Sequence, residues 1–395
     1  MAVRRRRQRD PARHHRHTEP GVAAMTDDML TPDEAELAST ARSFLSGFAD
    51  NSYLNEQEES EDGYEQARWK QMTGLGWTAV NLPERVGGGD GSLAEAAMAA
   101  REIGRAAYAS PLLQTMRTGT LLASLGPDEQ ADDLMARIAG GSPAAAVAPP
   151  DRTVRARARA GGAFLLSGSA AVVEWLTAAD TAVLLVPRAD SDGWLLATLP
   201  PEVVGERGVA VPSVDNERES LLDLDGVELP ASTALRDDVP AADAEYALAR
   251  ANLLRASAMV GGAEEVLAQS TEYAKTRHQF GRPIGAFQAV RHHLARMAIA
   301  VDGARLLTDE ALTRAEPGAH ETAIAGAALF AAGRSYVGAA LTGAQVHGGV
   351  GTTVEHILHH HFRRAKSMQL RCGKRANRLR ELHGALVVRQ EGGLW

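Results

Sequence analysis

The sequence is poor in cysteine, in aromatic residues and in long apolar runs. Its single cysteine, Cys372, excludes an intrachain disulfide, and we expect a small buried thiol there. Aromatic residues make up 5 % of the chain, too few for the stacking platforms that bind single-stranded nucleic acid. No apolar run approaches the roughly 20 residues of a membrane span, and no apolar signal segment follows the N-terminal charges. These absences favour a cytoplasmic protein that has no membrane span and no nucleic-acid partner.

Charge is spread unevenly along the chain. The net charge is −8, yet residues 1–24 carry seven arginines against two acidic residues, which leaves −13 on the remainder. Basic heads occur in nucleic-acid arms and in disordered tails, and the acidic remainder favours a tail. We therefore expect residues 1–24 to be a disordered basic tail. Met25, followed by Thr-Asp-Asp, is a second candidate start, in which case the tail carries no function.

The first region, residues 25–140, has a helical pattern. At 395 residues the chain is long for one core, so two or three subdomains are expected. Thr31 is a typical helix N-cap, because a proline and two acidic residues follow it. Apolar residues then recur every three to four positions, at Leu37, Ala41, Leu45 and Phe48.

The pattern changes after Gly140 and again near residue 236. Short alternating or β-branched runs predict a β domain over 141–235, with strands within 154–166, 181–186, 194–199 and 220–229. From 236 to 395, amphipathic stretches rich in small residues predict a four-helix bundle, with helices at 244–277, 284–315, 322–347 and 353–388. The fold class is therefore α+β, with an N-terminal helical domain, a middle β-barrel-like domain and a C-terminal four-helix bundle.

Two corners between the bundle helices hold residues that could bind an anion. Arg277 could hold a phosphate and Phe280 could lie against a planar ring. Taken alone, Arg277 fits better a helix C-terminus followed by a glycine stop. Gly348 and Gly349 let backbone N–H groups approach a phosphate, but a tight helix–helix turn has the same pattern.

As a spaced pair, the two corners are specific. The stretch Tyr273-Ala-Lys-Thr-Arg-His-Gln-Phe-Gly-Arg-Pro-Ile-Gly-Ala-Phe-Gln, followed later by Gln345-Val-His-Gly-Gly-Val-Gly, closely resembles the C-terminal bundle of acyl-CoA dehydrogenases. The resemblance covers residues 31–382. In the N-terminal region it rests on Trp69, Leu75-Gly-Trp77, Pro83-Glu84, Gly87-Gly88 and Glu102-Ile-Gly-Arg105.

The resemblance implies a tetramer with FAD at a dimer interface and an acyl-CoA thioester as substrate. A base removes the proton α to the thioester while hydride leaves the β carbon for flavin N5, and electron-transfer flavoprotein is a candidate electron acceptor. In the family, the neighbouring protomer grips the adenine and pyrophosphate end of FAD. The residues that match this grip are Arg277, Gln279, Phe280, Ile284, Gln288, Gln345, Gly348 and Gly349.

The catalytic base of the family has no match, so no catalytic residue is assigned. Many members carry the base as a glutamate where this chain has Cys372, and others carry it at the position of Ala251 or Ala258. A thiol is a poor substitute for a carboxylate, and alanine moves no proton. Glu265 lies about 10 Å along the helix from Ala258, beyond proton-transfer reach. Arg255, on the same face, could hold a substrate carboxylate but cannot act as base.

The segments that should face the flavin also depart from the family pattern. Residues 146–151 stand where members have a Thr-Glu-Pro-type loop, and residues 170–175 stand where a Lys-x-Trp-Ile-Thr-Asn-type segment backs the isoalloxazine ring. Glu174 replaces the hydroxyl residue, and a carboxylate there would disfavour the anionic reduced flavin. Trp175 is shifted in register, so we expect it to pack in the core.

Clustered histidines raise a metal site as an alternative. His356 and His360 are four residues apart, but consecutive histidines on a helix point in different directions. No acidic or third histidine partner is visible at a matching spacing, so a solvated or packed face is expected and no metal is assigned. The pair His292-His293 is interpreted in the same way.

Three hypotheses about function remain open. The first is a subunit that lacks a base and completes the FAD site of a partner subunit, because the half-site donated across the interface is kept and the flavin-facing half is lost. The second is a homo-oligomeric flavoenzyme with an unusual base or another reaction on an acyl thioester. The third is a non-enzymatic scaffold on this fold. The Gly-Val-Gly-Thr-Thr-Val-Glu-His run resembles subfamilies that handle steroid-like acyl groups.

Overall fold

The N-terminal region is helical, as its pattern predicts. The computed structural model describes residues 30–314 and 322–391, so the tail expected at 1–24 lies outside the described residues. Thr31 closes a capping box: its hydroxyl accepts from the Glu34 N–H at 3.3 Å, and the Glu34 carboxylate accepts from the Thr31 N–H at 2.8 Å. The helices are α1 (Pro32–Ser46), α2 (Asn51–Glu59), α3 (Gln66–Gly74), α4 (Leu93–Arg105), α5 (Leu112–Ser124) and α6 (Glu129–Ala139).

The middle region consists of three short sheets, with strand orders β1-β5-β6-β10, β2-β3-β9 and β4-β8-β7. Among the named strands of the described residues, β1 and β5 are the one parallel pair, and an isolated parallel bridge joins Ala156 to Arg188. Gly161 and Gly162, both with positive φ, form the expected turn between β2 and β3. The last strand extends to Val239, beyond the expected limit at 235. The strands are β1 (Ala144–Val147), β2 (Arg155–Ala158), β3 (Phe164–Ser167), β4 (Ser169–Glu174), β5 (Thr181–Pro187), β6 (Trp194–Leu199), β7 (Gly208–Val211), β8 (Glu219–Asp223), β9 (Glu228–Leu229) and β10 (Ala234–Val239).

The C-terminal region is a helical bundle, and its last segment differs from the prediction. A single helix was expected over 353–388, but the chain forms two helices. The first begins at Leu358, and the chain breaks at Gly373 before the second begins. Gly373 has φ +92°, a left-handed conformation that ends an α-helix. A Cβ at this residue would lie 3.0 Å from the Cβ of Pro150. The helices are α8 (Ala241–Thr276), α9 (Gln288–Arg314), α10 (Thr322–His347), α11 (Leu358–Arg371) and α12 (Arg375–Glu391).

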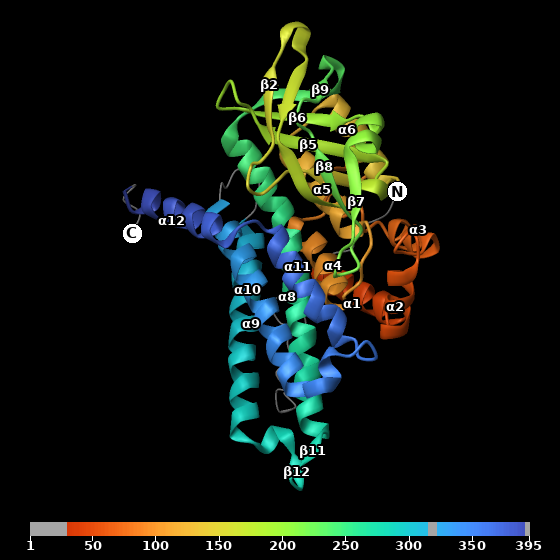
Figure 1. Cartoon of the computed structure of the whole chain (residues 1–395), viewed down its shortest axis with the longest axis vertical. Coiled ribbons are helices and arrows are strands. Elements are labelled where there is room, and N and C mark those ends of the chain that lie inside the picture. The colour runs from red at the N-terminus through yellow and green to blue at the C-terminus, as the bar shows by residue number, and fades with distance from the viewer. Residues whose placement is uncertain (1–29, 315–321, 392–395) are drawn as a thin grey trace, which may run out of the picture.

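The three regions are arranged along the long axis of the molecule (Figure 1). The β region lies at one end with α5 and α6 against it, the bundle extends to the other end, and α1 to α4 lie beside the upper part of the bundle. Helix α8 joins the regions, because it contacts α4, α5, α9 and α10. Helix α12 points away from the body of the molecule.

Helices α4 and α8 approach each other at glycines. A Cβ at Gly104 would lie 1.8 Å from the Ala258 carbonyl oxygen, and one at Gly261 would lie 1.9 Å from that of Arg101. These distances are far below van der Waals contact, so only glycine permits this approach. Because α8 also carries residues of the candidate site, this contact helps to place them.

One stretch of the bundle has the length and hydropathy of a membrane span. It covers α10 and the following turn, Thr322–Thr352, and half of its most apolar window is buried inside the protein. Its buried residues include Leu329 and Tyr336. The stretch is therefore the core helix of the bundle, packed against α8 and α9.

Candidate functional site

The two corners singled out in the sequence lie at the same end of the bundle (Figure 1). Arg277 follows the last turn of α8, ahead of the hairpin of β11 (His278–Gln279) and β12 (Arg282–Pro283). The rings of Tyr273 on α8 and His347 on α10 stack with centroids 4.2 Å apart. This contact brings the start of the Gly348 turn to the end of α8, so the structure brings the two motifs together.

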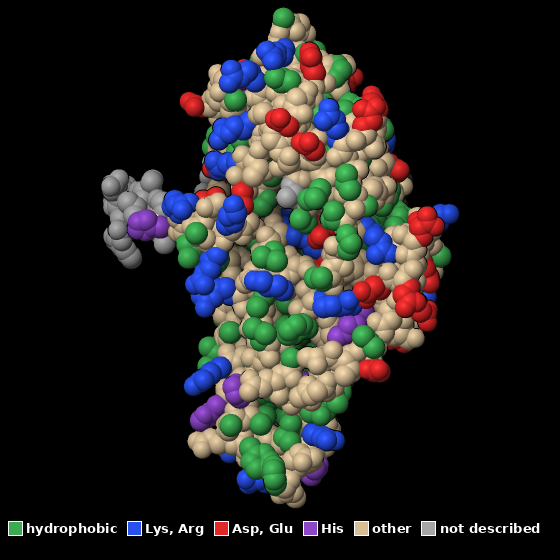
Figure 2. All heavy atoms as spheres, viewed as in Figure 1, with side chains coloured by type: hydrophobic (Ala, Val, Ile, Leu, Met, Phe, Trp, Pro, Cys, Tyr) green, Lys and Arg blue, Asp and Glu red, His purple; other side chains and the backbone are tan. Residues whose placement is uncertain are grey.

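The side chains of this end are turned outward. Phe280 is 91 % exposed, and Figure 2 shows apolar side chains gathered at the tip of the molecule. A Cβ at Gly348 or Gly349 would meet nothing within 4 Å, so the backbone there is open to a ligand or to a second chain. The residues that the resemblance assigns to FAD binding are all exposed or partly exposed: Arg277, Gln279, Phe280, Ile284, Gln288, Gln345, Gly348 and Gly349.

The three positions where the family carries a base hold buried side chains that do not ionise readily. Ala251 and Ala258 are both buried in α8. The Cys372 thiol donates to the Met368 carbonyl oxygen at 3.2 Å, and burial raises its pKa. Glu265 is turned to other partners, since its carboxylate lies 3.7 Å from the Arg105 guanidinium and accepts from Gln269 at 2.7 Å.

Glu174 lies at the centre of a buried group of charges that the sequence pattern did not predict. At the end of β4, its carboxylate pairs with Arg255 of α8, with Arg117 of α5 at 3.4 Å and with Arg371 of α11 at 3.7 Å. Burial alone would raise the pKa of Glu174, but Arg255, Arg371 and Arg117 outweigh it and hold the pKa below its usual value. Glu174 is therefore the ionised partner of these three guanidinium groups.

A second layer of charges continues this group toward β8. Arg371 also pairs with Asp215 at 2.6 Å and with Glu219, while Arg364 pairs with Glu217 at 2.6 Å. Four guanidinium groups thus face four carboxylates, which is how buried charges are tolerated. The sequence gave one sign of this group of charges, because Arg364 and Arg371 are seven residues apart and lie on the same helix face. We call this group the ion cluster: Arg117, Glu174, Asp215, Glu217, Glu219, Arg255, Arg364 and Arg371.

The ion cluster lies where the flavin-facing segments meet. Residues of the 146–150 loop and of β4 line a space of only about 40 Å³ together with Glu174, Arg255 and Arg371. A space of this size has room for a few water molecules. The same loop, with Arg117, Arg255 and Arg371, also lines a larger cavity. Trp175, as expected, packs in the core, where it is 1 % exposed and its indole N–H donates to Glu217.

A larger cavity of about 440 Å³ lies beside the ion cluster. It is bounded by α5, α8, the first turns of α10, α12 and the loop after β1. Ala251 lines it, so the cavity reaches one of the positions where the family carries a base. Its size falls within the roughly 300–1,000 Å³ of small-molecule sites.

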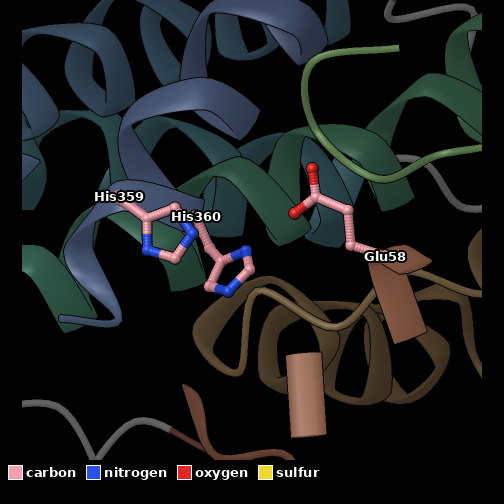
Figure 3. A group of neighbouring side chains, drawn as sticks. All are labelled: Glu58, His359 and His360. Atoms are coloured by element: carbon pink, nitrogen blue, oxygen red, sulfur yellow. The ribbon is translucent and has the colours of Figure 1, made fainter. Parts of the chain in front are cut away.

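Glu58, His359 and His360 lie close together, although the sequence gave no acidic partner for the histidines (Figure 3). The Glu58 carboxylate receives two hydrogen bonds of 2.6 Å from Arg363, and the same guanidinium donates to His360 Nδ1 at 3.2 Å. Arg363 thus already places a cation between the carboxylate and the imidazole. We assign this group to the contact between α2 and α11, and to no metal.

Comparison with known proteins decides the family. Residues 31–142 match the model of the acyl-CoA dehydrogenase N-terminal domain, and residues 242–385 match that of the C-terminal domain. Acyl-CoA dehydrogenase IpdE2 of Mycobacterium tuberculosis is 31 % identical over 340 residues, which cover 85 % of this chain and 92 % of that protein. This chain belongs to the acyl-CoA dehydrogenase family. FadE28 of the same organism is 30 % identical over 332 residues, covering 80 % of this chain and 91 % of that protein.

Solved structures agree with the acyl-CoA dehydrogenase fold. A variant of the Tcur3481–Tcur3483 steroid acyl-CoA dehydrogenase matches with a TM-score of 0.79 and 26 % identity, covering 91 % of this chain and 99 % of that chain. The ChsE4–ChsE5 complex of Mycobacterium tuberculosis matches with a TM-score of 0.81 and 24 % identity, covering 92 % and 99 %. Members of the family are FAD-dependent oxidoreductases that act on CH–CH groups.

Proposed function

We propose that this chain is the subunit of a heteromeric acyl-CoA dehydrogenase that lacks its own base and completes the FAD site of a partner subunit. The observation that carries the proposal is the contrast between the two ends of the chain. The bundle end exposes Arg277 and the Gly348 turn, whereas the segments expected to face the flavin depart from the family pattern and carry Glu174 of the ion cluster. A donor subunit in use would keep the half-site that it donates and could lose the other half. Decay without use would erode both halves.

The residues at the bundle end supply binding groups and no proton transfer. The Arg277 guanidinium would pair with the pyrophosphate of FAD, and the Phe280 ring would lie against a planar part of the cofactor. Backbone N–H groups at Gly348 and Gly349 would donate to phosphate oxygens without a side chain in the way. FAD, when bound, accepts the hydride, while the partner subunit supplies the base and the acyl-CoA site.

The relatives support an assembly of two different subunits. One similar structure is a complex of ChsE4 with ChsE5, and another is that of Tcur3481 with Tcur3483, a steroid enzyme. We extend the steroid-like acyl group to this chain on the resemblance of its Gly-Val-Gly-Thr-Thr-Val-Glu-His run. The assembly would work in the cytoplasm and pass electrons to an electron-transfer flavoprotein.

Co-expression with a partner tests the proposal. The partner is a family member encoded beside this chain. It has a glutamate at one of the base positions of the family, such as the position that Cys372 occupies in this chain. We expect a mixed tetramer with about two FAD per four chains, because each FAD needs one half from each kind of subunit. Size-exclusion mass and FAD absorbance measure both quantities. A homotetramer with one FAD per chain would refute the proposal and favour a homo-oligomeric flavoenzyme.

A variant in the bundle corner locates the contribution of this chain. In the complex, Arg277→Gln should weaken FAD binding about 10–100-fold, because hydrogen bonds to charged groups contribute about 1.5–3 kcal/mol. The control is Arg334→Gln, which removes an exposed arginine from α10. FAD titration of the apo-complex measures both. Equal affinities in the two variants would show that Arg277 does not hold the cofactor.

The chain alone should not dehydrogenate acyl-CoA. Ala251, Ala258 and the protonated Cys372 thiol stand where the family needs a carboxylate. The purified chain, supplied with FAD and a range of acyl-CoA thioesters, should therefore give no bleaching of the flavin absorbance. Rapid bleaching would contradict the proposal, and Cys372→Ala would then show whether the thiol had taken over as base.

A further inference from the structure

One face of helix α2 contacts the stretch that joins α10 to α11. We call this stretch, residues 348–357, the turn segment; it lies beside α2 (Figure 1). Asn51 and Asn55 both donate a side-chain N–H to the carbonyl oxygen of Val354, at 3.0 and 3.1 Å. Glu58, which pairs with α11, follows three residues later. A spacing of four and then three residues places these side chains on the same helix face.

The two asparagines share a single acceptor. A backbone carbonyl oxygen has two lone pairs, so it can accept both amides at once. The Val354 side chain is 62 % exposed, so α2 holds the turn segment here by its backbone. Loss of one asparagine therefore leaves a hydrogen bond in place, and loss of both removes the contact.

Hydrogen bonds within the turn segment connect this contact to its glycines. The Thr353 N–H and hydroxyl donate to the Val350 carbonyl oxygen at 3.3 and 3.2 Å. The Thr352 hydroxyl donates to the Gly349 carbonyl oxygen at 3.2 Å. Each bond joins residues three positions apart, as in a tight turn. A displacement of the Val354 carbonyl would therefore also displace the backbone at Gly349.

His347 fixes the other end of the turn segment. Its Nδ1–H donates to the Gly343 carbonyl oxygen at 2.9 Å, and its ring meets that of His356 edge to face with centroids 5.1 Å apart. A Cβ at Gly351 would lie 2.8 Å from the Cβ of His347, so the backbone packs closely against this residue. The two glycines of the corner lie between this anchor and the contact with α2.

We propose that Asn51 and Asn55 are positioning residues for FAD. By fixing the Val354 carbonyl, they hold the turn segment in the shape in which the N–H groups of Gly348 and Gly349 point to the phosphates of the cofactor. Donors that are already in place bind more tightly, because no free energy is spent on ordering them when the ligand arrives. The inference rests on the proposed function for the role of the turn segment in FAD binding. It adds the N-terminal helical region to a site otherwise formed by the bundle.

The first test needs no cofactor. Amide hydrogen exchange is measured on the purified full-length chain, and the double variant Asn51→Ala/Asn55→Ala should exchange the amides of the turn segment about tenfold faster. Each single variant should exchange them at nearly the rate of the unchanged chain. The control is Ser52→Ala/Glu56→Ala, which has the same spacing and removes a hydrogen bond from the exposed face of α2. Unchanged exchange in the double variant overturns the inference.

The second test measures the affinity for FAD. The assembly that binds FAD, mixed or homomeric, is stripped of the cofactor and titrated with it. Asn51→Ala/Asn55→Ala should bind FAD about tenfold more weakly, each single variant about threefold more weakly or less, and the control pair unchanged. Asn51→Ala/Asn55→Gln returns an amide donor and should restore the affinity to within about threefold. Equal affinities in the double variant and the control pair overturn the inference, even where the exchange is faster.

The outcomes separate this inference from the proposed function. A homotetramer with one FAD per chain refutes the donor role, yet the same variants are titrated in it and still decide the role of the asparagines. A mixed tetramer with about two FAD per four chains, in which the double variant binds FAD normally, keeps the donor role and overturns the positioning role. If neither assembly binds FAD, both are overturned.

Discussion

Glu174→Gln is expected to lower the free energy of unfolding by about 3–5 kcal/mol, the range found when one partner of a buried ion pair is removed. Glutamine keeps the shape of the side chain but leaves Arg117 and Arg255 without a carboxylate among the described residues. Both guanidinium groups are largely buried, so water cannot compensate for the loss. Urea unfolding followed by circular dichroism measures the change.

The pH dependence of this difference has a definite sign. The pKa of Glu174 is lowered in the folded chain, so its contribution to stability is present above its unfolded pKa and is lost as pH falls through the folded value. The gap between the unchanged chain and Glu174→Gln should therefore narrow in acid. Glu272→Gln is the control, because Glu272 belongs to an exposed pair with Lys275 and should change stability by less than about 1 kcal/mol. If Glu174→Gln is as stable as this control, the ion cluster does not depend on Glu174.

Gly104→Ala should destabilise the chain by about 3 kcal/mol, the upper end of the cost of overpacking. The added Cβ would lie 1.8 Å from the Ala258 carbonyl oxygen and 2.5 Å from its carbon. Both atoms belong to the backbone of a buried helix, so no side chain can turn away and α4 must separate from α8. Thermal unfolding measures the loss.

The matched control for this substitution is another helical glycine. A Cβ at Gly303 in α9 meets nothing within 4 Å. Gly303→Ala should therefore stabilise the chain by up to about 1 kcal/mol, because alanine favours the helix more than glycine does. Opposite signs for the same chemical change would show that packing, and not helix propensity, sets the cost at Gly104. A Gly104→Ala chain of unchanged stability would show that the two helices do not approach as closely as described.

The sequence alone determined the helical and strand periods and the identity of residues at fixed positions. The change of pattern after Gly140 separates helices from strands, because a side-chain period near 3.6 and one of 2 are distinguishable in the sequence. The spaced motifs around Arg277 and Gly348 identified the family, and the residues at 251, 258 and 372 could be read directly. Short strands such as β1 (Ala-Ala-Ala-Val) lacked a period and escaped notice.

Only the tertiary structure decided what the charged residues do. Arg117, Glu174, Arg255 and Arg371 lie on four different elements, and nothing in their local sequence shows that they meet. The pairing of buried charges depends on distance in space, whereas periodicity reports only which face of one element a residue occupies. For the same reason the packing of Gly373 against Pro150, which accompanies the break between α11 and α12, could not be foreseen. The sequence determined which groups this chain has, and the packing of α5, α8 and α11 against β4 determined that they meet in one buried ion cluster.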